Sequence, residues 1–195
     1  DDDGTGADDP TVAAIAANPS FDVAKSAGSV RVILTTIYEV TFTIDVTNTG
    51  NVTQSDIRVE DDLTAFIGSG VLRNADYPPS ISQSGFAGTP GTNGGYDGLV
   101  DTQLLTGNPE LAPGDTGQVI LTVTYQDFGN QASGNNTARA TSTQLPTPAT
   151  GGSTTAVTDD DGDGVPDFLE GCGPGADRDR DGVCDRADYH PTAYF

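Results

Sequence analysis

The chain has 195 residues, enough for one domain of ordinary size with appendages. It carries 29 acidic and 8 basic residues, for a formal net charge of −21. This composition argues against a nucleic-acid partner, because phosphate binding needs clustered Lys and Arg. The sequence contains no apolar run of membrane-spanning length, and its start at Asp1 is typical of a processed, secreted protein.

The acidic residues gather at the two ends of the chain. Residues 1–9 hold five aspartates and no base, residues 159–188 hold eleven acids and three arginines, and the middle holds thirteen acids and five bases. Like charges at such density keep a segment unfolded unless something neutralises them. The sequence therefore predicts a mildly acidic central domain with two acidic appendages. A salt-rich habitat is an alternative reason for the acidic, lysine-poor composition.

Alternation of apolar and polar residues predicts strands in the central part. The clearest is 39–48 (EVTFTIDVTN), where every second residue is apolar, and the next is 118–125. Shorter candidates, separated by turn-forming residues, are 20–25, 30–36, 55–61, 98–105 and 136–142. About seven short strands with glycine-rich turns predict an all-β fold, an immunoglobulin-like antiparallel β-sandwich. The acidic tail, described below, adds a predicted C-terminal calcium-loop appendage to this sandwich.

Composition also suggests where the domain begins and ends. The glycine-rich interval 80–98 is interpreted as a surface excursion with room for an edge strand. The stretch PTPATGGSTTAVT has the composition of a linker, which would close the sandwich near residue 145. We thus expect four parts: an N-terminal arm over 1–17, a sandwich over 18–145, a linker over 146–158 and a calcium-binding tail over 159–195.

Four segments of the central part together carry a resemblance to a known domain family. They are NPSFDVAKS, TFTIDVTNTGNVTQSDIRVEDDL, DTQLLTGNPELAPGDTGQVILTVTY and NNTARATST. Through them, residues 18–145 resemble the bacterial and archaeal "conserved repeat domain", a surface-protein family of unknown function with an immunoglobulin-like fold. The resemblance implies a structural or adhesive module of extracellular proteins, usually in tandem arrays, of which this chain has one copy.

The strongest chemical signal is a repeated spacing of oxygen ligands in the tail. DDDGDGVPDFLE starts at Asp159 and has Gly164 at its sixth position, and DRDRDGVCDRAD starts at Asp177 and has Gly182 there. This is the spacing of a calcium loop, in which alternate carboxylates and one backbone carbonyl converge on the ion. The predicted calcium ligands are Asp159, Asp161, Asp163, Val165, Asp167 and Glu170 in the first loop, and Asp177, Asp179, Asp181, Val183, Asp185 and Asp188 in the second.

The segments before the two loops, GGSTTAVT and GCGPGA, are not amphipathic helices. Both loops instead resemble thrombospondin type 3 calcium repeats, and that resemblance implies carboxylates wrapped around calcium in place of a hydrophobic core. Cys172 and Cys184 fit this picture, because a disulfide between them would close a short ring and contribute about 3 kcal/mol. An unstructured acidic tail that keeps the protein soluble is the alternative.

No catalytic motif is present, so the chain is predicted not to be an enzyme. His190 is the only histidine and lies near the C terminus, and there is no nucleophile elbow, phosphate loop or zinc-protease motif. The acidic run 60–62 is interpreted as a solvated strand end. Tyr77, Tyr96 and Tyr125 are interpreted as core or edge residues, with a sugar-binding groove as the alternative.

The segment 11–19 (TVAAIAANP) is small and apolar and lies outside the family resemblance. An isolated strand of this kind needs a sheet edge, either in its own sandwich or, by donor-strand exchange, in the next subunit. The second arrangement propagates into a filament. The leading prediction is a secreted structural subunit of a calcium-stabilised filament or cell-surface assembly, a homo-oligomer joined through the arm and the tail. A monomeric adhesin or carbohydrate-binding module with a calcium-stiffened stalk is the alternative.

Overall fold

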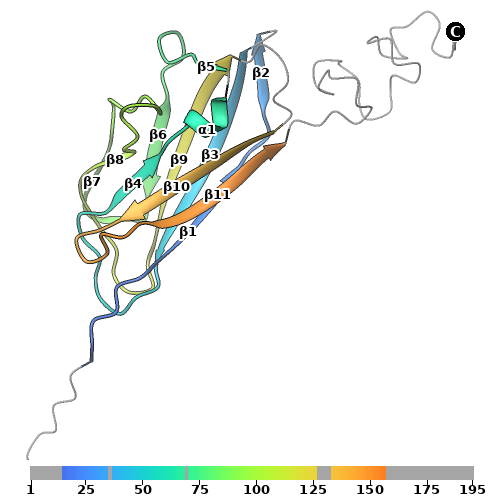
Figure 1. Cartoon of the computed structure of the whole chain (residues 1–195). Helices are drawn as coiled ribbons and strands as arrows, with labels where there is room; N and C mark the ends of the chain where they lie inside the picture. The colour runs from blue at the N-terminus through green and yellow to red at the C-terminus, as the bar shows by residue number, and fades with distance from the viewer. Residues whose placement is uncertain (1–14, 35–36, 69, 127–132, 157–195) are drawn as a thin grey trace, which may run out of the picture.

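The computed structural model describes residues 15–34, 37–68, 70–126 and 133–156. Most of the acidic arm and the whole predicted calcium tail lie outside these residues. In the described part, nearly all regular structure is antiparallel strand, arranged as two facing sheets with a small hairpin at one side (Figure 1).

The larger sheet is built around three long strands in the order β1–β3–β9. Two short strands, β5 and β6, pair one after the other with the free side of β9, and β2 pairs with the start of β3. The bounds are β1 Phe21–Ala27, β2 Arg31–Leu34, β3 Ile37–Asn48, β5 Val71–Leu72, β6 Ser80–Ser84 and β9 Thr116–Gln126.

The smaller sheet has the order β11–β10–β4, and a separate hairpin joins β7 to β8. Its strands are β4 Arg58–Asp61, β10 Ser133–Thr141 and β11 Ala149–Ala156, and the hairpin strands are β7 Ala87–Thr92 and β8 Leu105–Glu110. With β1, β3, β9 and β6 in one sheet and β11, β10 and β4 in the other, the order is that of a constant-type immunoglobulin domain. The predicted all-β sandwich is confirmed.

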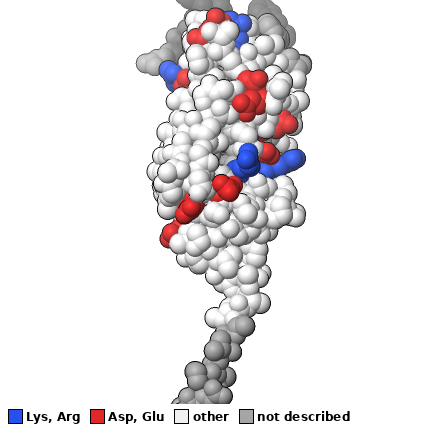
Figure 2. Space-filling model, turned by 90° about the vertical axis from the view of Figure 1, so that its left-hand side faces the viewer, with Lys and Arg blue, Asp and Glu red and all other residues white. Residues whose placement is uncertain are grey.

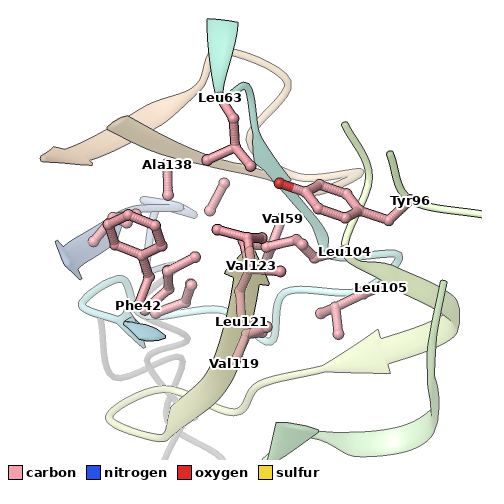
Figure 3. Packing of buried hydrophobic residues seen from close by; sticks show 14 of the residues in the cluster. Phe42, Val59, Leu63, Tyr96, Leu104, Leu105, Val119, Leu121, Val123 and Ala138 are labelled. Atoms are coloured by element: carbon pink, nitrogen blue, oxygen red, sulfur yellow. The ribbon is translucent and has the colours of Figure 1, made fainter. Parts of the chain in front are cut away.

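The core fills the space between the two sheets, as the alternating pattern predicts. Phe42 of β3 is paired with Leu121 of β9, and both side chains are fully buried. Across from them, Val59 of β4 and Ala138 of β10 close the core from the smaller sheet (Figure 3). Full burial of one large apolar side chain contributes about 1.5–3 kcal/mol, so the contacts of Phe42 and Leu121 stabilise the packing of the two sheets.

One turn of helix, α1 (Thr64–Ile67), completes the core beside β10. It places Phe66 between two aromatic rings of the larger sheet, with ring centroids 5.3 Å from Phe42 and 5.1 Å from Tyr125, both edge to face. Such edge-to-face pairs are a favoured aromatic geometry and add to the free energy of burial.

The predicted linker is wrong in part, because residues 149–156 form β11 and pair with β10 from Ala149 to Ala156. The sandwich therefore does not close near residue 145. The composition of this strand, ATGGSTTA, conceals it, since its stability comes from the backbone ladder and from close contact with β1. A Cβ atom on Gly151 would lie 2.1 Å from the carbonyl oxygen of Val23, so only glycine fits at that contact.

The interval 80–98 also contains more strand than expected, since it supplies β6 at the edge of the larger sheet and β7 of the hairpin. The predicted strand 98–105 is wrong, because β8 begins only at Leu105. Asp97 explains the difference: its Oδ1 accepts hydrogen bonds from the backbone N–H groups of Leu99, Val100 and Asp101. This side-chain cap holds the segment as a turn.

Gly151→Ala tests the contact between β11 and β1. We expect the free energy of unfolding to fall by about 1–3 kcal/mol, because the new methyl group meets backbone atoms that cannot move aside. Gly152→Ala is the matched control, since the nearest atom to its Cβ would be Thr137 Oγ1 at 3.5 Å. Urea unfolding of both variants measures the difference, and equal stabilities would contradict the assigned contact.

Candidate functional site

Three polar side chains take inward positions on strands whose other inward residues are apolar. Lys25 follows Phe21 and Val23 along β1, while Asp61 and Asn136 occupy the same kind of position on β4 and β10. The strand period of two forces these three side chains between the sheets. We call Lys25, Asp61 and Asn136 the core polar cluster; it joins residues from both sheets.

The cluster is centred on one carboxylate oxygen. Lys25 Nζ lies 2.5 Å from Asp61 Oδ2, and both side chains have no exposed surface. Asn136 Nδ2 donates to the same Oδ2 at 3.4 Å, and this residue is 1% exposed. The amine and the carboxamide are therefore neighbours inside a water-free core.

Aromatic residues enclose the cluster. Lys25 Nζ lies 4.7 Å from the centre of the Phe42 ring, and the hydroxyl of Tyr96 donates to the backbone carbonyl of Asp61 at 3.0 Å. Tyr96 is itself buried, and burial raises the pKa of its hydroxyl, so it stays a neutral donor. The surroundings fix the backbone of Asp61 and exclude water from its side chain.

Burial favours the neutral forms of both charged groups. Desolvation lowers the pKa of the Lys25 amine, and the nearby Asp61 carboxylate only partly opposes it. Desolvation raises the pKa of the Asp61 carboxyl, against the opposing effects of Lys25 and Asn136. Both shifts favour a neutral amine beside a carboxylic acid, a pairing that a dry core stabilises over isolated ions.

Two acceptor atoms of the cluster have no hydrogen-bond partner among the described residues. They are Asp61 Oδ1 and Asn136 Oδ1. Unpartnered polar atoms inside a core cost free energy, commonly about 1–3 kcal/mol each, and call for an explanation.

The interpretation of the acidic run as a solvated strand end is wrong for Asp61, which is fully buried, and holds for Asp62, which is exposed. The available signal was parity, because Asp61 shares a strand face with Val59. The same signal marks Lys25, which shares a face with Phe21 and Val23 and is the only lysine in the chain. The interpretation of the tyrosines as core or edge residues is confirmed for Tyr96 and Tyr125, which are buried, while Tyr77 is half-buried in the segment between β5 and β6.

A second feature is a polar pocket of about 320 Å³ beside the hairpin. Asn93 Nδ2 donates at 3.0 Å to both carboxylate oxygens of Asp101, and Gln103 Nε2 donates to Glu60. The pocket is open on one side and offers hydrogen-bonding groups; its lining includes Asp56, Arg58, Asn93, Asp101, Gln103 and Thr106.

The predicted calcium site lies outside the described residues. This applies to all twelve ligand positions from Asp159 to Asp188, to Cys172 and Cys184, and to His190. Within residues 15–156 as described, no group of three or more His, Cys, Asp or Glu side chains could hold a metal ion. The calcium loops and the disulfide stay predictions from the sequence.

On the face drawn in Figure 2, charged side chains are sparse. Figure 2 shows one face on which acidic side chains stand in small groups between uncharged areas, with a few basic ones beside them. No helix in the described part of the chain is long and apolar enough to cross a membrane.

Comparison with known proteins assigns no family. No protein-family model matches the chain, and no curated protein matches it. One similar solved structure is a family 123 glycoside hydrolase from Clostridium perfringens, with 11% identity and a TM-score of 0.36 over 71% of this chain and 28% of that one. Another is the collagen-binding domain of a Staphylococcus aureus adhesin, with 10% identity and a TM-score of 0.35 over 70% of this chain and 96% of that one. The chain thus spans less than a third of the hydrolase.

Lys25→Met should destabilise the fold by about 3–5 kcal/mol, because it leaves Asp61 buried without its partner. Arg31→Met is the matched control: Arg31 pairs with Glu39 at 2.8 Å on the surface, where such pairs contribute about 1 kcal/mol or less. Denaturant unfolding of both variants measures the difference, and equally small effects would contradict a buried pair.

The same two variants should differ in their dependence on pH. Burial holds the pKa of Asp61 above its ordinary value of 3.8, and Lys25 opposes this shift. In Lys25→Met the folded state therefore binds a proton that the unfolded state releases. The contribution of this proton to the stability of Lys25→Met is fully present below pH 3.8 and is lost as the pH rises through the folded-state pKa of Asp61. The difference in free energy of unfolding between Lys25→Met and Arg31→Met should therefore widen as the pH rises.

Proposed function

We propose that the chain is a structural subunit of a calcium-stabilised extracellular or cell-surface assembly. The observation that carries the proposal is the placement of the two ends of the sandwich. The segment that leads into β1 lies at one end of the domain, and the arrow of β11 ends toward the other (Figure 1). The chain enters and leaves at opposite ends, as a module that passes tension along its long axis must.

The first and last strands are suited to this load. β1 is paired along its whole length with β3, and β11 is paired along its whole length with β10. Tension between the ends would shear these ladders, so that many backbone hydrogen bonds have to break together. Contact between β1 and β11 at Gly151 couples the two sheets along the same path.

The arm leaves the sandwich at a fixed point. Asn51 donates to the carbonyl of Ala16 at 2.8 Å and accepts from the N–H of Asn18 at 2.7 Å. Immediately before this anchor, Ile15 is 85% exposed and so lies away from the core of its own domain. An apolar segment that emerges in this way supports pairing with the sheet of a neighbouring subunit, the arrangement proposed for 11–19.

Calcium would make the acidic tail rigid. The two loops bring together carboxylates that repel each other in the absence of a cation, and Cys172 and Cys184 would add a covalent constraint. The proposal is independent of any catalytic activity.

Neutralising one carboxylate in each calcium loop should weaken calcium binding. We expect Asp161→Asn combined with Asp179→Asn to lower calcium affinity at least tenfold from a starting Kd of about 10⁻⁴–10⁻³ M, the range of extracellular calcium modules. Asp8→Asn combined with Asp9→Asn removes the same charge outside the loops and should leave the affinity unchanged. Calorimetric titration distinguishes the two, and the absence of calcium binding by the full chain would end this part of the proposal.

Deletion of residues 1–15 should abolish assembly and give monomers, because it removes the part of segment 11–19 that precedes the anchor, Ile15 included, and keeps the contacts of Asn51 with Ala16 and Asn18. Deletion of residues 1–9 removes the acidic end alone and should leave assembly intact. Analytical ultracentrifugation and negative-stain imaging, with calcium and with chelator, are the measurements. Fibres that persist without residues 1–15 would refute donor-strand exchange.

The polar pocket supports a second candidate, a monomeric adhesin or carbohydrate-binding module. Asn93, Asp101 and Gln103 offer hydrogen-bonding groups of the kind that sugars use. Glycan binding and the oligomeric state together distinguish the binding module from the structural subunit. Glycan binding by a chain that stays monomeric at all concentrations supports the binding module, and concentration-dependent polymerisation supports the structural subunit.

A further inference from the structure

The core polar cluster has the composition of a reaction site as well as that of an ion pair. It holds a primary amine, a carboxyl group and a carboxamide, all without contact to solvent. Lys25 is the only lysine of a strongly acidic chain, yet its amine lies in the core, where a charged side chain costs the most free energy. Apolar residues in place of both Lys25 and Asp61 would give a core at least as stable, so stability alone does not explain the lysine.

The geometry points to an intramolecular isopeptide bond between Lys25 Nζ and Asn136 Cγ, formed by the folded domain itself with Asp61 as the catalytic proton carrier. The bond would join β1 of the larger sheet to β10 of the smaller one. This inference goes beyond the proposed role in assembly and does not depend on calcium.

The nucleophile is the neutral amine of Lys25. Burial lowers the pKa of this amine, and Asp61 Oδ2 lies 2.5 Å away to take its proton. Transfer of that proton turns the ion pair into an amine with a free lone pair beside a carboxylic acid. Phe42 closes the space on one side of the amine and keeps water from it.

The electrophile is the carboxamide carbon of Asn136. Asn136 and Lys25 are hydrogen-bonded to the same oxygen of Asp61, so the strands hold the two reacting groups together before any chemistry occurs. Such fixed proximity replaces a bimolecular encounter and is worth a large factor in rate. Asn136 Oδ1, which has no partner among the described residues, is the oxygen on which negative charge develops.

The acid in the proposed reaction is Asp61, whose Oδ1 has no hydrogen-bond partner among the described residues. A proton on its carboxyl group lets Asp61 donate a hydrogen bond to the Asn136 carbonyl and so stabilise the developing charge. Rotation of the carboxamide about its terminal torsion exchanges Oδ1 and Nδ2 and brings either atom toward the acid. The backbone of Asp61 is held in place by Tyr96.

The atoms balance without any co-reactant. The amine lone pair attacks Cγ of Asn136, and the new C–N bond gives a tetrahedral intermediate. Asp61 accepts a proton from the attacking nitrogen and returns one to the carboxamide nitrogen. The original C–N bond then breaks, ammonia leaves, and the product is a secondary amide with Asp61 again protonated. Exclusion of water from the cluster prevents hydrolysis of the intermediate.

The first experiment uses the unaltered full chain. After reduction of any disulfide, its denatured mass should be about 17 Da below the mass calculated from the sequence, the loss of one ammonia molecule. Trypsin should fail to cut after Lys25, and residues 1–31 should be recovered joined to residues 74–139. Full mass together with normal cleavage after Lys25 would overturn the inference.

The same digest separates two bonding partners. An amide between Lys25 and Asp61 would release water, a loss of about 18 Da, and would join residues 1–31 to residues 59–73. That result would overturn the roles assigned to Asp61 and Asn136. Because both readouts come from the unaltered chain, they stand even where a variant fails to fold.

Variants then assign the roles. Asn136→Ala and Asp61→Asn should each retain the full mass. Asn136→Ala lacks the electrophilic carboxamide, and Asp61→Asn lacks the group that transfers the protons. Asn135→Ala alters the exposed neighbour on the same strand and should show the 17 Da loss in full. Asn136→Ala should also melt about 10 °C below Asn135→Ala, since it lacks the cross-link. Loss of ammonia in Asp61→Asn at the unaltered rate would refute the catalytic role of Asp61.

Discussion

The ladder between β3 and β9 is the interaction on which the rest of the domain depends. It runs without a break from Ile37 paired with Gln126 to Thr47 paired with Thr116, and it supplies eight of the 21 residues of the buried apolar cluster in the described part of the chain. β1 pairs with the outer side of β3, and β6 pairs with the outer side of β9. The position of Lys25 within the sandwich therefore follows from this central pair, since the register of β1 against β3 fixes which residues face inward.

Against that apolar background, the core polar cluster is an exception that sets a condition on the fold. A lysine, an aspartate and an asparagine can share a dry core only if their charges cancel and their hydrogen-bonding groups meet. The strands that carry them come from both sheets, so the cluster forms only when the sheets have docked in register. Its presence makes the fit between the sheets specific in a way that apolar contacts alone do not.

The sequence was informative where one physical signal dominates. Period-two alternation located β3 and β9 and hence the fold class, and parity along β1 would have placed Lys25 in the core. The sequence does not predict β11, because a strand with two adjacent glycines lacks the alternation of apolar and polar residues. Its pairing with β10 is a long-range contact that only the structure shows. The sequence predicts a strand at 98–105, where the structure has a turn at 98–101. The hydrogen bonds from this turn to the Asp97 carboxylate are seen only in the folded chain. The proximity of Asp61 to Asn136 likewise depends on how β4 and β10 pair, which no local pattern encodes.

The burial of Lys25 has a practical consequence for work with this protein. Since the chain has one lysine and its side chain is fully covered, the folded domain offers no ε-amino group to the medium. Reagents that acylate amines under native conditions are left with the α-amino group of the chain. A surface coated through such chemistry would hold every molecule by the same end, with the sandwich in a uniform orientation.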